Sequence, residues 1–157
     1  MNERFTRLIF NFFLFALCVV SFNTYRAQSI AGVVNIYTAV TNMTPSSVTV
    51  TSSNGFAVGD RVLLIQMKGA LINTSNTASF GQITNLGSAG NFEFTNIASI
   101  TGNQITFVAN LCKSFSPAGK VQLIRVPVYN QATINGVVSA TPWNGTIGGV
   151  VAIEATT

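Results

Sequence analysis

The chain has 157 residues, of which 48% are hydrophobic and 8% are charged, with eight Lys and Arg against four Asp and Glu and no histidine. The absence of histidine excludes Ser-His and Cys-His nucleophiles, His-ligated zinc and imidazole proton shuttles. The length allows one domain with a short appendage. Low charge combined with many Thr, Ser, Asn and Gly residues is typical of an extracellular β protein.

Residues 1–27 show the charged, apolar, polar order of a secretory signal peptide. Arg4 and Arg7 precede an apolar run over residues 8–22, and we place the cleavage after Ala27. The apolar run is shorter than the roughly 20 residues that a helix needs to span the ~30 Å hydrocarbon core of a bilayer. An uncleaved anchor formed by residues 8–22, holding a periplasmic module, is the alternative.

Removal of residues 1–27 leaves five basic side chains against three acidic ones. The remaining cations are scattered along the chain, so we predict no binding of nucleic acid. Cys112 is then the single cysteine, which excludes an intramolecular disulfide even in an oxidising compartment. We expect its side chain to be buried and apolar, near the end of a strand.

Alternation of apolar and polar residues recurs along most of the remaining chain, and no window shows a helical stripe. We therefore predict an all-β fold for residues 28–157, a small β-barrel or β-sandwich of about seven to nine strands. Clusters of Asn, Gly, Ser and Pro separate these strands. The predicted strands cover residues 33–40, 47–51, 61–68, 82–86, 92–100, 104–109, 120–128, 132–139 and 150–155.

The predicted strand at residues 61–68 has one face formed by Leu63, Ile65 and Met67, while its other face turns from apolar to polar at Gln66. Successive side chains of a strand point to opposite faces. The pattern therefore predicts a strand that starts between two layers and ends at a rim.

The segment Thr101-Gly102-Asn103 is a short connection containing glycine, which predicts a hairpin between the strands on either side. In the second strand, Ile105 and Phe107 are expected to point inward. In the first strand, Ile97 and Ile100 fall on opposite faces, which favours a bulge or burial on both sides.

Residues 69–91 form the longest irregular stretch and contain one weak strand. Long loops in compact domains are either functional or mobile. We expect this stretch to be an insertion folded over one end of the barrel or sandwich.

The three acids that remain each have a structural interpretation. Asp60 follows Gly59 directly before a strand, where a short acceptor stabilises a tight turn. Glu93 and Glu154 are expected on the outward faces of strands, because each alternates with apolar neighbours. A glycosidase pair needs two carboxylates roughly 5–10 Å apart, and calcium needs clustered oxygen ligands. We therefore predict no enzyme activity, no catalytic residue, no metal site and no cofactor.

The aromatic residues Trp143 and Tyr129 are the candidate glycan contacts. Trp143 lies in a Pro-Trp-Asn-Gly turn, and Tyr129 follows Pro127 and Val128. Exposed aromatic rings stack on sugars, although a tryptophan in a turn is more often packed on the core. Both alternatives stay open for Trp143.

Three segments, residues 53–70, 119–129 and 143–152, carry a family resemblance that covers nearly the whole chain after the signal peptide. They resemble the N-terminal region of the gliding-motility-associated surface proteins that have a C-terminal sorting domain for the type IX secretion system. The resemblance implies export, display on a cell surface and a chain that continues through β-solenoid-like repeats. It brings no catalytic residues with it.

A weaker similarity connects the Gly-Phe-x-x-Gly-Asp-x-Val turn, in this chain residues 55–62, to the leading modules of right-handed β-helix proteins that bind or process polysaccharide. The last predicted strand also stops at Thr157 without a turn or cap. We expect the module to be truncated at its C-terminal end and to lead into a β-solenoid.

The resulting hypothesis is a non-enzymatic structural or adhesive N-terminal module of a larger protein, secreted by or displayed on a Gram-negative bacterium. The alternative is the leading module of a carbohydrate-binding or carbohydrate-processing β-helix protein whose active site lies outside this chain. The expected partners are the export machinery and surface polysaccharide or other envelope proteins, with membrane contact through the signal segment alone. Open strand edges with little charge make self-association possible.

Overall fold

The computed structural model describes residues 27–156, so the predicted signal peptide, with Cys18, lies almost entirely outside the described residues. The described chain is all-β, as predicted, with one short 3-10 helix, η1 (Pro117–Gly119). Its twelve strands are β1 (Gln28–Val33), β2 (Ile36–Met43), β3 (Ser47–Val50), β4 (Arg61–Gln66), β5 (Leu71–Ile72), β6 (Ile83–Asn85), β7 (Phe92–Thr101), β8 (Gln104–Phe107), β9 (Val121–Arg125), β10 (Val128–Tyr129), β11 (Ala132–Ser139) and β12 (Glu154–Ala155).

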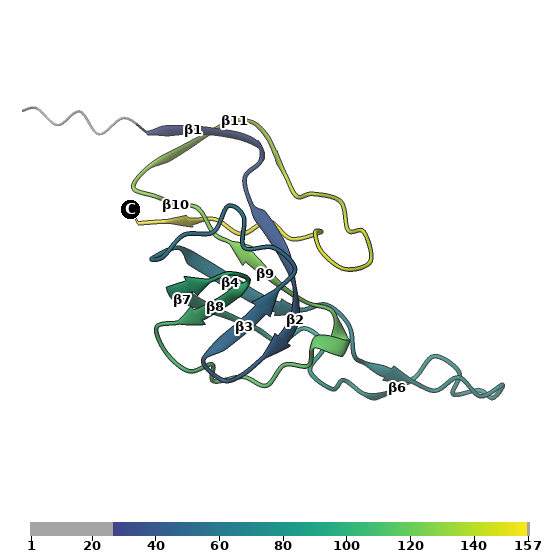
Figure 1. The fold of residues 1–157 in the computed structure, drawn as a ribbon. Helices are drawn as coiled ribbons and strands as arrows, with labels where there is room; N and C mark the ends of the chain where they lie inside the picture. The colour runs from purple at the N-terminus through teal and green to yellow at the C-terminus, as the bar shows by residue number, and fades with distance from the viewer. Residues whose placement is uncertain (1–26, 157) are drawn as a thin grey trace, which may run out of the picture.

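Six strands close into a barrel in the order β2-β3-β8-β7-β4-β9, and β9 pairs again with β2 (Figure 1). All neighbours in the barrel are antiparallel. A closed barrel leaves none of its strands with an open edge, which protects a module with few charges from pairing with other chains. The predicted small barrel is therefore confirmed.

The inside of the barrel is filled by aliphatic and aromatic side chains that come from alternate positions of its strands and from the loop before β4. Leu64, Ile105 and Leu123 lie at the centre and have no exposed surface. The buried members of this cluster are Val40, Val48, Val50, Phe56, Val62, Leu64, Ile97, Ile105, Phe107, Val121 and Leu123.

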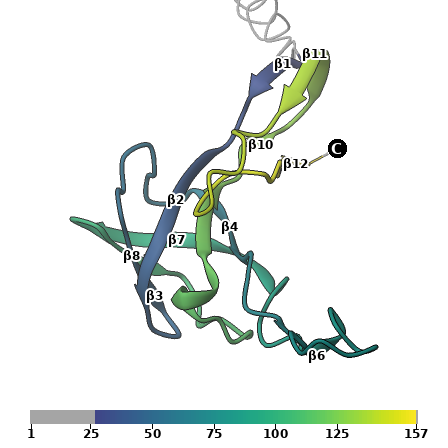
Figure 2. The same cartoon turned by 90° about the vertical axis from the view of Figure 1, so that its right-hand side faces the viewer.

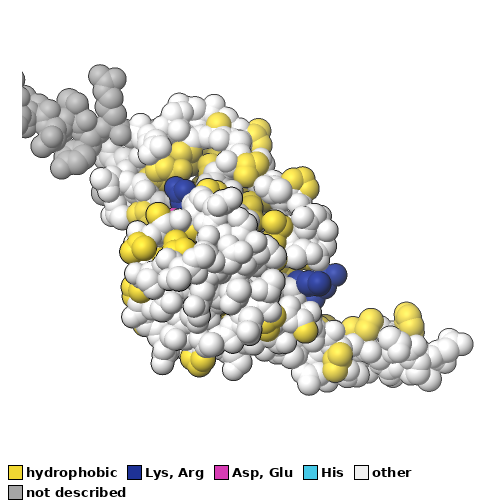
Figure 3. All heavy atoms as spheres, viewed as in Figure 1, with side chains coloured by type: hydrophobic (Ala, Val, Ile, Leu, Met, Phe, Trp, Pro, Cys, Tyr) yellow, Lys and Arg dark blue, Asp and Glu magenta, His cyan; other side chains and the backbone are white. Residues whose placement is uncertain are grey.

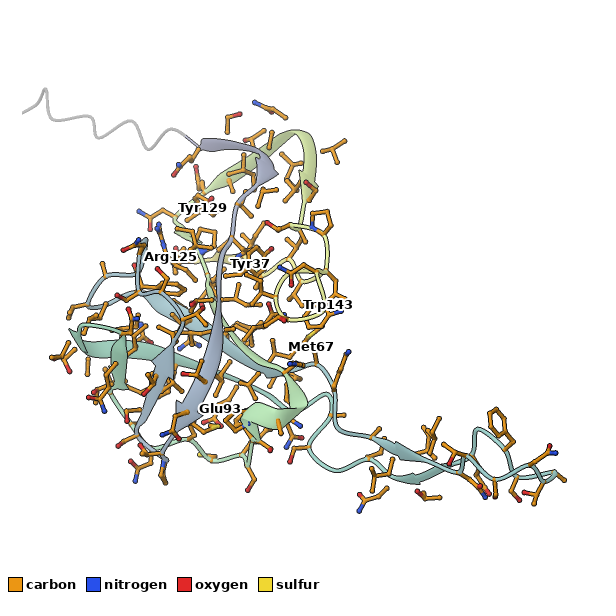
Figure 4. All side chains as sticks on the ribbon, turned by 45° about the vertical axis from the view of Figure 1, so that its right-hand side comes forward. Tyr37, Met67, Glu93, Arg125, Tyr129 and Trp143 are labelled. Carbon is orange, nitrogen blue, oxygen red and sulfur yellow. The ribbon has the colours of Figure 1, made fainter. Side chains whose placement is uncertain are left out.

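A second apolar cluster lies on the outer face of the barrel. Leu63 of β4 and Ile124 of β9 point outward and pack with Val126 and Ala152. Residues 141–153, which we call the strap, cross this face between β11 and β12 and cover it (Figure 4). The strand β4 is thus buried on both faces, as predicted for its first half.

The hairpin between β7 and β8 is confirmed in detail. Thr101 pairs with Gln104, and Gly102 has a φ of 57°, a value that suits glycine in a tight turn. The register shifts between Ile97 and Ser99, which is the bulge that the sequence favoured. In β8, Ile105 and Phe107 point into the barrel as expected.

Several predicted strands have different bounds in the structure. Residues 33–40 straddle a break between β1 and β2. Residues 120–128 are interrupted before β10, where Pro127 has no N–H group for the ladder. Residues 150–155 shrink to the two residues of β12, because the strap is held by side chains from the barrel instead of by a neighbouring strand.

The expectation for residues 69–91 is wrong. They form a two-stranded antiparallel arm, β5 with β6, that projects away from the barrel in both views instead of folding over it (Figures 1 and 2). The arm contains two short strands, whereas the sequence pattern predicted only one, at residues 82–86. We use the name arm for residues 69–91.

Two further strand pairs are parallel. β1 pairs with β11, and β10 pairs with β12, and both pairs lie at the end of the molecule opposite the arm (Figure 1). Val128 aligns with Glu154 and Tyr129 with Ala155, so residues 130–153 make a complete turn before the chain returns beside itself. No helix of the described residues is long and apolar enough to cross a membrane.

Candidate functional site

Three polar side chains bind the backbone of the strap and fix it on the barrel. Asn35 accepts a hydrogen bond from the N–H of Ala152 at 3.0 Å and donates to its carbonyl oxygen at 2.6 Å. Gln122 binds both the N–H and the carbonyl oxygen of Gly148, at 2.8 and 3.0 Å. Both amides are buried, so these bonds form where water does not compete.

Tyr37 makes the third contact, since its hydroxyl donates to the carbonyl oxygen of Val150 at 2.6 Å. Burial raises the pKa of Tyr37 above its ordinary value of 10.0, because the phenolate loses solvation, while a backbone hydrogen bond with Thr141 acts in the opposite direction. A raised pKa means that the folded state favours the neutral phenol.

We expect the stability of the strap to depend on pH through Tyr37. The neutral phenol contributes fully below the unfolded pKa of about 10, and its contribution is lost as the pH rises through the higher pKa of the folded state. The free energy of unfolding should therefore fall more steeply above pH ~10 in the wild type than in Tyr37→Phe. At neutral pH this variant should lose about 1 kcal/mol through the missing hydrogen bond. Urea unfolding followed by circular dichroism at neutral and alkaline pH measures both effects, and equal slopes would contradict the assignment.

Four charged side chains form two ion pairs near the start of β4. Arg61 contacts Glu154 at 3.1 Å, and Arg125 contacts Asp60 at 3.6 Å. Asp60 also accepts the N–H of Ala57 at 2.8 Å, which confirms its predicted role in a tight turn. Because these pairs are partly exposed, they contribute at most about 1 kcal/mol each. The pair of Arg61 with Glu154 connects β12, which follows the strap, to the barrel, while the pair of Arg125 with Asp60 joins the end of β9 to the turn before β4.

The third acid, Glu93, lies on β7 and binds backbone instead of a cation. Its carboxylate accepts the N–H groups of Cys112 and Lys113 at 2.9 to 3.0 Å. The prediction of an outward position is wrong, because Glu93 pairs with Leu64 and therefore lies on the inner face of β7, while Phe92 and Phe94 point outward. The sequence also did not indicate that this carboxylate fastens the loop after β8. Each described acid is therefore engaged in a structural contact.

The expectation of a buried Cys112 is wrong. Its side chain is exposed, because residue 112 lies in the irregular segment after β8 and not within the strand. Beside it is a surface pocket of about 300 Å³, between the β2–β3 turn and this segment. The pocket is lined by Met43, Thr44, Pro45, Leu111, Cys112, Lys113, Ser114 and Phe115.

The structure does not bring the two candidate glycan contacts together. Tyr129 belongs to β10 and Trp143 to the strap, and the two residues lie apart from each other in Figure 4. Both side chains are half-buried, so each ring keeps some surface in contact with water. Neither lines the surface pocket. Their role in glycan binding stays a prediction.

The sequence pattern did not predict the burial of three amide side chains, Asn35, Gln66 and Gln122. Gln66 was expected at a rim, yet it is only 2% exposed. Its side chain accepts the N–H of Ser116 at 2.7 Å and donates to the carbonyl oxygen of Lys68 at 2.7 Å. One signal in the sequence could have indicated this burial. Gln66 follows the apolar residues of β4, and an amide in such a strand is able to pair with buried backbone groups.

No family model and no curated protein matches the sequence. Among solved structures, the chain is similar to the gp54 tailspike of Acinetobacter baumannii bacteriophage AP22, solved with a capsular saccharide, at 15% identity and a TM-score of 0.40 over 67% of this chain. It is also similar to the tailspike gp49 of Pseudomonas phage LKA1, at 17% identity and a TM-score of 0.37 over 76% of this chain. The chain spans 17% and 20% of those proteins, and similarity of this size does not establish a shared ligand.

Proposed function

We propose that the chain is a non-enzymatic structural or adhesive module of a larger secreted surface protein, of the gliding-motility-associated type. The observation that carries the proposal is the parallel pairing of β10 with β12 and of β1 with β11. The chain leaves β10, passes through β11 and the strap, and returns beside β10 in the same direction, which is the geometry of a solenoid turn. The closed barrel next to this turn has no open edge, as suits the capping unit of a stack.

The contacts of the acids support a scaffold in place of an enzyme. Asp60 and Glu154 are held by arginines, and Glu93 is held by backbone N–H groups. A general acid needs a carboxyl group free to exchange its proton with a substrate. If one of these carboxylates acted as a general acid, its structural contact would be lost. Asp60 would release its turn, Glu154 would release β12 from Arg61, and Glu93 would release the loop after β8.

The native protein on intact cells tests the location and the processing that this function requires. An antibody against the folded chain should detect a polypeptide longer than 157 residues that external protease removes from whole cells. Its N-terminus, read by mass spectrometry, should follow Ala27. A product that retains Met1 and resists external protease would instead support the anchored periplasmic module.

A second candidate function is polysaccharide binding, as the leading module of a carbohydrate-binding or carbohydrate-processing β-helix protein with its active site elsewhere. The observation that favours it is that the rings of Tyr129, on β10, and of Trp143, on the strap, are each partly exposed. Aromatic rings of this kind combine an apolar face with a polar group.

We expect Tyr129→Ala combined with Trp143→Ala to weaken the binding of polysaccharide isolated from the producing cells at least tenfold, about 1.4 kcal/mol. Isothermal titration calorimetry measures the change. The matched control is Phe92→Ala with Phe94→Ala, which removes two exposed rings elsewhere on the barrel and should leave the affinity unchanged. Unaltered affinity in the first variant, with the fold intact, rejects the aromatic platform.

A further inference from the structure

The arm exposes five large apolar side chains and contains no charged residue. An isolated two-stranded ribbon is only marginally stable in water, and clusters of exposed apolar side chains on a protein usually mark a contact surface. Figure 3 shows hydrophobic side chains along the projection. The five exposed side chains are Leu71, Ile72, Phe80, Ile83 and Leu86, each 50 to 67% exposed.

Several polar groups of the arm are bonded within the arm itself. The Asn73 carboxamide oxygen accepts from the N–H and the hydroxyl of Ser75. The Thr84 hydroxyl donates to the carbonyl oxygen of Leu71, and the Asn85 side chain accepts the N–H of Gly87. Polar groups that already have partners cost less to move out of water. These bonded groups therefore lower the cost of moving the arm out of bulk water.

The three lysines of the described chain lie near the root of the arm. The N–H of Lys68 donates to the carbonyl oxygen of Gly119, which places Lys68 beside Lys120. The Lys113 ammonium lies 4.6 Å from the centre of the Phe92 ring, the first residue after the arm. The ion pairs found within residues 27–156 involve arginines and no lysine. Figure 3 shows basic side chains where the arm meets the barrel.

We propose that the arm inserts into the interface of an anionic lipid bilayer, with these lysines at the headgroup phosphates. Apolar side chains without charge favour the boundary between headgroups and acyl chains, and each nearby lysine adds attraction to anionic lipid. A second copy of the chain is a less favourable partner for the arm than a bilayer. Two arms in contact would bring their lysines close together, and these like charges repel each other. The contact is additional to the one predicted for the signal segment and does not depend on the proposed function.

A fluorescent reporter on the arm tests the proposal with the protein isolated after export. Phe80→Trp in a Trp143→Phe background places the single tryptophan of the chain on the arm. With vesicles of equimolar phosphatidylglycerol and phosphatidylcholine, its emission should shift to shorter wavelength and be quenched by brominated lipid. With phosphatidylcholine alone, both effects should be much weaker.

The matched control is Val137→Trp in the same background, at a residue that is 83% exposed on β11, far from the arm. It should show neither effect, which also excludes a signal that arises from residues 1–27. Lys68→Gln and Lys120→Gly should each raise the lipid concentration for half-maximal quenching about fivefold. Lys120 has a φ of 57°, which glycine adopts without steric cost, so Lys120→Gly keeps the fold.

Two results would overturn the proposal. One is a reporter that stays in water with both kinds of vesicle. The other is a shift in emission that appears without lipid and grows with protein concentration, which would identify the arm as a contact between copies. Sedimentation velocity without lipid distinguishes the second result from the first.

Discussion

Gly148→Ala is expected to detach the strap and to lower the free energy of unfolding by about 3 kcal/mol, the sum of a backbone and a hydrogen-bond effect. Gly148 has a φ of +100°, and a Cβ atom there would lie 2.6 Å from the carbonyl oxygens of Thr141 and Pro142. Because these are backbone atoms, the strap itself must shift. The shift would break both hydrogen bonds to the buried Gln122 amide.

Gly145→Ala is the matched control for this prediction. Gly145 also has a positive φ, +94°, but a Cβ atom there meets nothing within 4 Å. It should therefore cost only the roughly 1 kcal/mol of an unfavourable backbone conformation. Urea unfolding compares the two variants, and equal losses would show that the clash and the Gln122 contact do not stabilise the strap.

Leu123→Ala is expected to lower the free energy of unfolding by about 2 to 5 kcal/mol, because it leaves a cavity at the centre of the barrel. Leu123 has no exposed surface, and its strand β9 lies between β2 and β4, so the cavity is enclosed by rigid strands. A loss of this size is a large part of the 5 to 15 kcal/mol that stabilise an ordinary domain.

Val137→Ala serves as the comparison for the barrel core. Val137 is 83% exposed on β11, so its truncation should change the free energy of unfolding by no more than about 0.5 kcal/mol. The midpoints and slopes of urea unfolding give both values. A loss in Leu123→Ala as small as that in Val137→Ala would contradict the assignment of the barrel interior as the main core.

The local features of the fold were predictable because they depend on residues close together in the sequence. The hairpin at Gly102, the alternation of Ile105 and Phe107, the bulge after Ile97 and the turn at Asp60 all follow from period and turn chemistry. The strand at residues 132–139 was predicted with the bounds that β11 has. The all-β class follows from the same period-two pattern.

The candidate contacts were less predictable, because burial depends on what the rest of the chain places nearby. Cys112 has an apolar neighbour in Leu111, but the loop that contains it stays on the surface. Gln66 looks like the polar end of a strand, yet Ser116 from a distant segment covers it. The two aromatic candidates, Tyr129 and Trp143, were chosen by residue type, and the fold separates them.

Residue types and their local order are enough to predict the class of the protein, because a chain without histidine, poor in charge and rich in alternating β-branched residues forms a β module without imidazole chemistry. Tertiary structure decided the rest. The barrel closes because β9 finds β2, the strap lies where Asn35 and Gln122 bind its backbone, and the arm projects from a root that Gln66 secures. These contacts join residues far apart in the chain, and a local pattern of polarity carries no information about which distant partner will satisfy a buried polar group.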